Sequence, residues 1–221
     1  MEQQLNLSRN NLSRNSVMLR TAVSAFALTA FCILAYNVSQ GNTDAFDREL
    51  SGLIYSLRND FTKSIFVPWT YLGNAAVIIS AIGVLTVIPR TRWSIGMPSA
   101  ITGSLTFILY KFLKQNFARP RPDEIFHLIE QGGFSFPSGH SMNGLFCYGM
   151  MIFLIRKTCE DKAAANILSV VLGILITGIG FSRIFVGVHY PTDVIGGFLL
   201  GMVCLMLVSL GIDKLRYNFE K

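Results

Sequence analysis

The amino-acid sequence predicts an all-α integral membrane protein with six transmembrane helices and an interfacial amphipathic helix between the first two spans. Hydrophobic residues make up 51% and charged residues 14% of the 221-residue chain, whereas soluble domains carry roughly 25% charged residues. Apolar stretches of about 18 residues, long enough to cross a bilayer as a helix, recur along the chain. Basic residues also gather in alternate connections between these stretches.

The six predicted spans have boundaries that are soft by a few residues. They cover residues 21–38, 72–89, 95–113, 138–155, 166–186 and 192–212. Arginines precede the first span, as in a secretory signal, but the following AYNVSQG lacks a small-x-small cleavage site, so we expect this span to be retained. The chain is therefore divided into a loosely ordered N-terminal tail (1–20), a six-span domain (21–213) and a C-terminal tail (214–221).

The net charge of +6 follows the positive-inside pattern of membrane proteins. With six spans and the N-terminus inside, the cytoplasmic segments carry 11 of the 19 basic residues and five of the 13 acidic ones, and the other segments carry eight of each. This asymmetry predicts a multi-pass protein of the cell (inner or plasma) membrane with both termini in the cytoplasm, where the basic excess faces anionic headgroups. It argues against a nucleic-acid partner.

The connection between the first two spans contains DAFDRELSGLIYSLRND, residues 44–60, which has helical periodicity. Asp47, Arg48, Ser51 and Arg58 fall opposite an apolar face. That face is formed by Phe46, Leu50, Leu53, Ile54 and Leu57. Such a helix either lies on the outer membrane surface or packs over the ends of the spans, and the periodicity is compatible with both.

Two further features have simple structural interpretations. The four cysteines are scattered without metal-ligand spacing, so we expect small buried apolar residues rather than disulfides or metal ligands. Gly197 and Gly201 form a GxxxG pattern in the last span, which predicts close packing against another helix of the same chain.

Basic residues outside the cytoplasmic segments are concentrated at span ends on one side of the membrane. Lys111, Lys114, Arg119 and Arg121 leave the third span in KFLKQNFARPRP, and Arg183 lies near the outer end of the fifth. A single cation at a span end reaches toward the headgroups by default. The convergence of several cations with histidines argues instead for a binding site.

Two of the three histidines stand at outer-facing helix starts. His140 follows a Pro-Ser-Gly sequence, and His189 precedes Pro191; both prolines predict the first position of a helix. A helix N-terminus presents free N–H groups and a partial positive charge, which favour a bound anion. The small Ser138 and Gly139 would let that anion approach the backbone closely.

A phosphate is the anion that these groups suit. The planar fork of arginine matches two phosphate oxygens at once, and lysine supplies a point charge. One histidine could attack phosphorus while the other protonates the departing oxygen. Asp193, four residues after His189, is placed to accept a hydrogen bond from the ring nitrogen that is not used in attack. Each residue alone also has an ordinary role at a helix end, but together they predict a phosphate site.

These residues resemble the three-part signature of the type 2 phosphatidic acid phosphatase superfamily. Its KxxxxxxRP element corresponds to residues 114–122, its PSGH element to residues 137–140 and its SRxxxxxHxxxD element to residues 182–193, in that order. The resemblance implies a six-helix membrane phosphatase whose site faces the outer (periplasmic or extracellular) side and which needs no metal or other cofactor. No His or acidic cluster in the sequence has metal-ligand spacing.

By the same resemblance, each matched residue has an implied role. His189 looks like the nucleophile that forms a phosphohistidine, with Asp193 as its orienting partner. His140 looks like the general acid for the leaving group. The implied phosphate-binding residues are Lys114, Arg121, Ser138, Gly139 and Arg183.

The sequence therefore predicts an integral-membrane enzyme that removes the terminal phosphate of a lipid phosphate. Undecaprenyl diphosphate, phosphatidylglycerophosphate and phosphatidate are equal candidates, because tail recognition uses unspecific apolar surface. The alternative is a phospholipid or phosphate transporter that uses the same cationic cluster, although transporters usually have broken helices or inverted repeats that meet at mid-membrane. The oligomeric state stays open.

Overall fold

Helices form the secondary structure of the chain, with no strand in residues 2–219. The computed structural model describes the backbone of these residues and the side chains of residues 14–89, 91–93 and 96–214; residues 1, 220 and 221 of the predicted tails lie outside this range. The long helices are α1 (Glu2–Ser39), α6 (Met97–Phe117), α7 (Gly139–Thr158), α8 (Lys162–Phe185) and α9 (Pro191–Phe219). The short elements are α2 (Asp44–Ser56), α3 (Asp60–Tyr71), α4 (Ala75–Val87), α5 (Pro89–Thr91), a π-helical turn η1 (Arg92–Gly96) and a 3₁₀ turn η2 (Glu124–Phe126).

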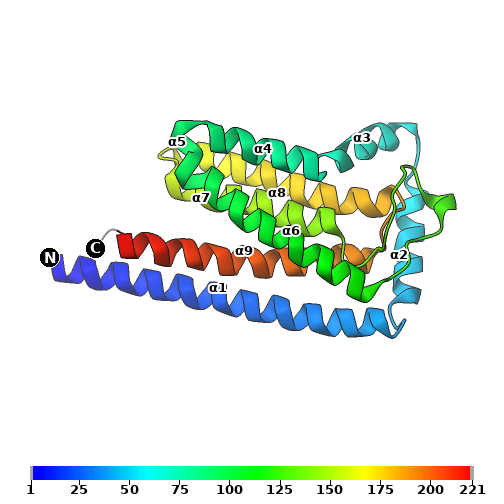
Figure 1. Cartoon of the computed structure of the whole chain (residues 1–221), viewed down its shortest axis with the longest axis horizontal. Coiled ribbons are helices and arrows are strands. Elements are labelled where there is room, and N and C mark those ends of the chain that lie inside the picture. Colours follow the sequence, from blue (N-terminus) through cyan, green and yellow to red (C-terminus); the bar gives the residue numbers. More distant parts are fainter. Residues whose placement is uncertain (1, 220–221) are drawn as a thin grey trace.

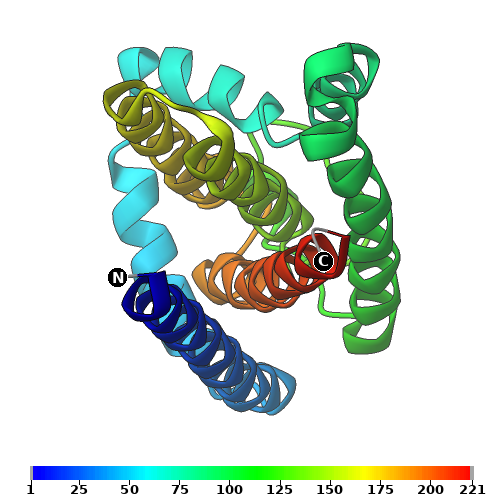
Figure 2. The same cartoon turned by 90° about the vertical axis from the view of Figure 1, so that its left-hand side faces the viewer.

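The long helices run along one common direction, and α2 crosses one end of the bundle (Figure 1). Helix α7 packs between α8 and α9, and α1 lies along the other side of α9. Figure 2 shows the bundle end-on, with α1 and α9 adjacent and α6 on the far side of α9 from α1. Both labelled ends of the chain lie at the end of the bundle opposite α2 (Figure 1).

Each of the six predicted spans coincides with a helix, but not every one of these helices is long and apolar enough to cross a membrane. Among the described residues, α1, α8 and α9 are long and apolar enough to cross a membrane. Helices α3 and α4 would add a fourth span as a pair bent by 55°. Helices α6 and α7 do not meet the same criterion, because polar residues interrupt their apolar sequence, including Lys111 and Lys114 in α6 and His140 and Asn143 in α7.

The predicted second span, residues 72–89, corresponds to α4, and a break in the helix precedes it. The helix stops at Tyr71 and begins again at Ala75, where the side chain of Asn74 caps α4 by accepting a hydrogen bond from the Ala76 amide at 3.3 Å. The Tyr148 hydroxyl of α7 donates to the Leu72 carbonyl at 2.7 Å, which holds the break against the bundle. The break thus depends on a side-chain cap and on a contact with a distant helix, neither of which a hydropathy pattern includes.

The expected loose tail over residues 1–20 is also wrong, because α1 begins at Glu2. Residues 2–20 contain no proline or glycine, so the helical hydrogen-bond ladder of the span continues toward the N-terminus without a steric interruption. The C-terminal helix likewise continues to Phe219, past the predicted end of the span at residue 212.

Helix α2 forms where periodicity predicted it and packs against α8 and α9. Its orientation differs from the simple amphipathic expectation. Asp47 and Ser51 of the polar face are buried together with Ile54, whereas Phe46 and Leu53 of the apolar face are exposed. The structure therefore shows a helix packed over the ends of α8 and α9 that directs a carboxylate into the protein.

The predicted close packing of the GxxxG pattern is confirmed, and its partner is α7. A Cβ atom added to Gly197 would lie 2.5 Å from the Ser138 carbonyl oxygen, so only glycine allows α9 to approach the start of α7 this closely. Of the cysteines expected to be buried, Cys147 is buried and Cys32 is exposed. The contact at Gly197 places the starts of α7 and α9 side by side, and the candidate site lies there.

Candidate active site

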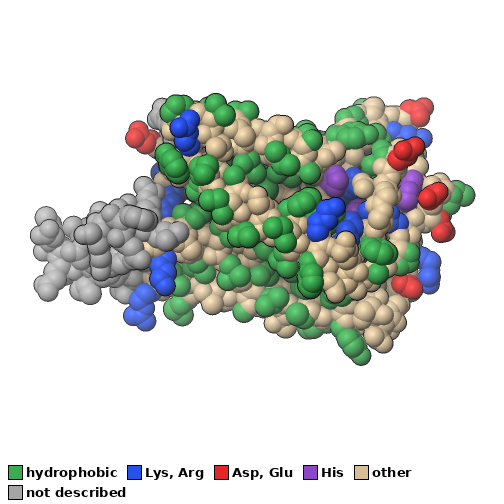
Figure 3. Space-filling model, in the orientation of Figure 1, with side chains coloured by type: hydrophobic (Ala, Val, Ile, Leu, Met, Phe, Trp, Pro, Cys, Tyr) green, Lys and Arg blue, Asp and Glu red, His purple; other side chains and the backbone are tan. Residues whose placement is uncertain are grey.

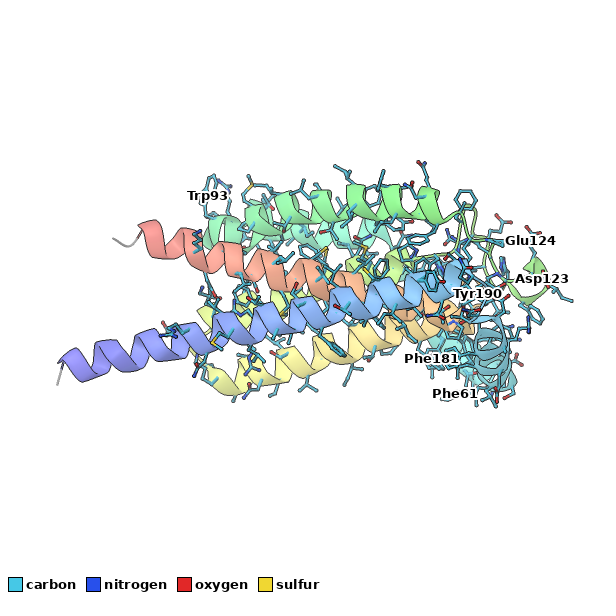
Figure 4. The ribbon with its side chains drawn as sticks, turned by 90° about the horizontal axis from the view of Figure 1, so that it is seen from below. Phe61, Trp93, Asp123, Glu124, Phe181 and Tyr190 are labelled. Carbon is cyan, nitrogen blue, oxygen red and sulfur yellow. The ribbon has the colours of Figure 1, made fainter. Side chains whose placement is uncertain are left out.

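Three segments far apart in the sequence meet at the end of the bundle remote from the termini. They are the segment that follows α6, the start of α7 and the connection between α8 and α9. In the face shown in Figure 3, histidine and most acidic side chains gather toward this end, and hydrophobic and neutral side chains cover the middle. Figure 4 places Tyr190, Asp123 and Glu124 at this end and Trp93 at the other.

His189 and Asp193 face each other across the first turn of α9. Pro191 begins this helix, as predicted, and His189 precedes it. Both side chains are buried, and Nδ1 of His189 lies 3.3 Å from Oδ2 of Asp193. The same carboxylate oxygen accepts a hydrogen bond from the Tyr190 amide at 2.9 Å, which fixes the carboxylate.

Arg121 approaches the other ring nitrogen of His189. Its Nη1 lies 3.3 Å from Nε2 of His189 and donates to the Val188 carbonyl at 2.6 Å. A guanidinium only donates, so Nε2 acts as the acceptor and the proton of the neutral ring resides on Nδ1, facing Asp193. Burial, followed by the charges of Arg121, Arg183 and Lys114, lowers the pKa of His189 well below its ordinary value of 6.5. The ring therefore presents an unprotonated Nε2 to the cationic side chains around it.

Arg183 is buried and extended between two other segments. Its Nη1 donates to Thr70 Oγ1 and its Nη2 to Gln131 Oε1, each at 2.7 Å. Its Nε has no hydrogen-bond partner among the described residues although it is buried. A buried unpaired N–H of a guanidinium is costly unless a ligand accepts from it. This donor is therefore available for an anion.

The start of α7 differs in detail from the sequence prediction. Ser138, not Pro137, caps the helix, and its Oγ accepts hydrogen bonds from the amide and hydroxyl of Ser141 at 3.4 and 3.0 Å. The Ser138 amide donates to the Asp193 carbonyl at 2.9 Å, which ties the starts of α7 and α9 together. The Gly139 backbone is covered by Tyr110 of α6, whose ring would lie 2.5 Å from an added Cβ.

Lys114 and His140 complete the group of residues predicted from sequence. Lys114, in the last turn of α6, is 8% exposed and its Nζ lies 3.3 Å from the Tyr110 hydroxyl. His140, in the first turn of α7, lines the same cavity as Arg183. The structure thus brings together the predicted cations and both histidines.

His140 lies where two cavities meet. One, of about 430 Å³, is lined mainly by apolar side chains of α4, α6 and α7; the other, of about 440 Å³, is lined by polar groups that include Thr70, Gln131 and Arg183. His140 and Asn74 line both cavities. His189 is buried and lines neither. A ligand that reaches His140 can therefore extend into both the apolar cavity and the polar cavity.

Several residues around the site were not predicted from sequence. Arg119 was recognised only as one of the outer cations, yet it lies between Asp193 and the buried Asp47. Thr70 and Gln131 were missed because a lone hydroxyl or amide carries no pattern. For Arg119 a signal existed, namely the second arginine two residues before Arg121 in ARPRP.

The donor set of the site suits an anion rather than a metal ion. Within the part of the chain that the structure describes, no group of three or more His, Cys, Asp or Glu residues is placed to hold a metal. The two buried carboxylates, Asp47 and Asp193, are both paired with Arg119. The cations and histidines that were predicted from the sequence supply guanidinium, ammonium and imidazole groups, which match phosphate oxygens.

The fold and the site together define a helical membrane protein that gathers cationic side chains and two histidines at one end of its bundle. The chain belongs to the PAP2 superfamily, whose family model matches residues 94–217. The resemblance of the three sequence elements is thereby confirmed, and the chain is a membrane phosphatase of this superfamily.

Individual relatives agree with this assignment. Phosphatidylglycerophosphatase B of Bacillus subtilis is 30% identical over 179 residues, which is 79% of this chain and 87% of that protein. An undecaprenyl-diphosphatase of Sulfolobus acidocaldarius is 29% identical over 161 residues, 71% of this chain and 73% of that protein. The crystal structure of a transmembrane PAP2-type phosphatidylglycerolphosphate phosphatase from Bacillus subtilis matches with a TM-score of 0.79 at 27% identity, covering 86% of this chain and 96% of that one.

Proposed function

We propose that this protein hydrolyses the terminal phosphate of a membrane lipid, namely phosphatidylglycerophosphate, undecaprenyl diphosphate or phosphatidate. The observation that carries the proposal is the unprotonated Nε2 of His189, set among cations and fixed by Asp193. The apolar cavity that reaches His140 supports a lipid rather than a soluble ester. The names of the similar proteins, a phosphatidylglycerophosphatase and an undecaprenyl-diphosphatase, support the first two substrates.

The proposed reaction has two steps. In the first, Nε2 of His189 attacks phosphorus, the bond between phosphorus and the lipid oxygen breaks, and His140 donates a proton to that oxygen. In the second, His140 takes a proton from water, the water oxygen attacks phosphorus, and the bond to His189 breaks to release inorganic phosphate. The His189 ring becomes positively charged in the first step and neutral again in the second. Asp193 stabilises this positive charge.

Cationic side chains are proposed to supply the electrostatic part of catalysis. Lys114, Arg121 and Arg183, together with the Gly139 amide, would stabilise charge on the three equatorial oxygens of the transferring group. Ser138 would contribute indirectly, because its amide donates to the Asp193 carbonyl and its hydroxyl caps α7. The unpaired Nε of Arg183 supports this role. Because these groups take the part that Mg²⁺ plays in many phosphoryl transfers, we expect activity without an added metal and no loss in EDTA.

The proposed topology places six spans in the membrane, with residues 21–213 as the membrane domain, both termini in the cytoplasm and the site at the outer surface. The positive-inside pattern supports it, as does the position of both chain ends at the end of the bundle opposite α2. A cysteine introduced at Asp123, in a chain without its own four cysteines, should react with an impermeant maleimide in intact cells. A cysteine introduced at Lys214 should react only after lysis. The reverse labelling pattern would show that the protein has the opposite orientation in the membrane.

The decisive experiment is phosphate release by the purified protein in detergent. We expect one or more of the three lipids to be hydrolysed with a higher kcat/KM than p-nitrophenyl phosphate, in the presence and absence of EDTA. Preferred turnover of the soluble ester would contradict the lipid-substrate proposal. Lipid or phosphate binding without hydrolysis would favour the transporter alternative, and loss of activity in EDTA would reveal a metal requirement.

A further inference from the structure

We propose that Asp47, the buried carboxylate of α2, is a positioning residue that keeps Asp193 directed at His189. It acts through Arg119 and through the first turn of α9. The inference rests on the proposed hydrolysis at this site, and it concerns Asp47, a residue that lies outside the three sequence elements of the family signature.

Asp47 is buried and uses both carboxylate oxygens. Its Oδ1 accepts a hydrogen bond from the Thr192 amide at 2.9 Å, and its Oδ2 accepts from the Thr192 hydroxyl at 2.6 Å. Thr192 is the second residue of α9, so its amide is one of the N–H groups that a helix leaves unpaired at its start. Asp47 therefore caps α9 from another helix, and its negative charge interacts favourably with the helix dipole.

Arg119 bridges Asp47 and Asp193 with its two terminal nitrogens. Nη2 donates to Asp47 Oδ2 at 2.7 Å, and Nη1 donates to Asp193 Oδ1 at 2.8 Å. Because a guanidinium is planar and rigid, fixing one of its ends fixes the other. Burial by itself lowers the pKa of Arg119, but the charges of Asp193 and Asp47 outweigh it and raise this pKa above its ordinary value.

A continuous series of contacts therefore runs from Asp47 through Arg119 and Asp193 to the ring of His189. Two carboxylates share one guanidinium in this arrangement, so Arg119 neutralises each of them only in part. Without the charge of Asp47, Arg119 would pair with Asp193 alone. Asp193 would then be drawn from His189 and would stabilise a positive His189 ring less well.

A purely structural role is the competing explanation, since the same contacts hold α2 onto α9. The two explanations differ in whether the effect of Asp47 depends on Arg119. A double-mutant cycle separates them, because residues that act through one another show non-additive effects.

The experiment uses the full-length protein in detergent with phosphatidylglycerophosphate as substrate. We expect Asp47→Asn to lower kcat about 10- to 100-fold with little change in KM, as for removal of other oriented catalytic partners. In an Arg119→Gln background, the same substitution should lower kcat by less than about threefold, because the route through the guanidinium is already broken. An equal loss in both backgrounds, or an unchanged kcat for Asp47→Asn, would overturn the proposal.

Asp44→Asn is the matched control. Asp44 lies on the same helix and its Oδ1 is 3.8 Å from Arg119 Nη2, but its side chain is 56% exposed. The substitution removes the same charge from the same neighbourhood without touching Thr192. We expect kcat within about twofold of the parent protein, because an exposed charge at this distance is screened. If Asp44→Asn lowered kcat as much as Asp47→Asn, the effect would come from the total negative charge of α2 and not from the specific contacts of Asp47.

A second readout does not depend on turnover. In histidine-ring NMR spectra, Asp47→Asn should shift the His189 signals, whereas Asp44→Asn should leave them in place. If no lipid were hydrolysed, the proposed function would fail while these spectra still tested the link to His189. If Asp47→Asn did not fold, Arg119→Lys would replace it, since a lysine keeps the charge but cannot bridge both carboxylates. Unmoved His189 signals in a folded variant would contradict the proposal.

Discussion

Nδ1 of His189 lies 3.3 Å from Oδ2 of Asp193, one helical turn further along the chain. The carboxylate is held by two further donors, the Tyr190 amide at 2.9 Å and Nη1 of Arg119 at 2.8 Å. The Ser138 amide holds the backbone carbonyl of the same residue at 2.9 Å. The imidazole is thus oriented by a group that is itself fixed on several sides. In the proposed mechanism, such preorganisation leaves Nε2 as the atom that attacks phosphorus.

The proposed nucleophile makes the first prediction. His189→Ala should abolish turnover, and Asp193→Asn should lower kcat roughly 10²- to 10⁴-fold, because an amide can orient the ring in the wrong tautomer. Phosphate release and thermal unfolding should be measured on the same samples. His127→Gln is the control, since His127 bonds to the Pro122 carbonyl at 2.9 Å and lies outside the proposed machinery. Near-normal turnover by folded His189→Ala would refute the assignment.

The proposed general acid makes the second prediction. Removing a general acid costs most when the leaving oxygen is strongly basic, as in a lipid alkoxide, and least when it is a stable anion such as p-nitrophenolate. His140→Ala should therefore lower kcat/KM about 10²- to 10⁴-fold for phosphatidate but much less for p-nitrophenyl phosphate. Steady-state kinetics with both substrates provide the measurement. Equal losses for the two would indicate that His140 binds phosphate instead of donating a proton.

The lowered pKa of His189 makes the third prediction. In the unfolded chain a histidine titrates near 6.5, whereas in the folded, ligand-free protein His189 should stay neutral at that pH. As pH falls below 6.5 the unfolded state binds a proton that the folded state does not, so the contribution of His189 to stability decreases on acidification. NMR titration of the three histidines, assigned by single substitutions, tests this. A His189 signal that titrates near 6.5 would contradict it.

The contact between α7 and α9 makes the fourth prediction. Gly197→Ala would place a Cβ 2.5 Å from the Ser138 carbonyl oxygen, so the two helix starts must separate, at a cost of about 1–3 kcal/mol. We expect a lower unfolding temperature together with reduced turnover, because Ser138 also bonds to Asp193. Gly211→Ala, in the same helix with no atom within 4 Å of its added Cβ, serves as the control and should match the parent protein. An unaffected Gly197→Ala variant would show that the close approach is unnecessary.

Much of the fold and of the candidate site could be predicted because the relevant signals are local. Each predicted hydrophobic run coincides with a helix of the structure, and the prolines and small residues around His140 and His189 indicated helix starts. The identities of the cations and histidines were readable for the same reason, since each belongs to a short element with fixed spacing. Membership of the PAP2 superfamily agrees with those elements.

The break between α3 and α4 and the orientation of α2 could not be predicted in this way. The break depends on the Asn74 cap and on Tyr148 of α7. The orientation of α2 depends on Arg119 and Thr192, which lie 72 and 145 residues from Asp47. A pattern of apolar spacing assumes that polar residues face outward, and it cannot anticipate a distant guanidinium that makes a buried carboxylate favourable.

The sequence by itself therefore determined the helical membrane class, the family and the residues of the candidate phosphate site, because these follow from composition, periodicity and short spacings. Tertiary structure alone decided how those residues are held. It buried Asp47, placed Arg119 between two carboxylates and set His140 where an apolar and a polar cavity meet. The physical reason is that burying and pairing charges depends on which segments meet in space, and that is a property of the whole packed bundle.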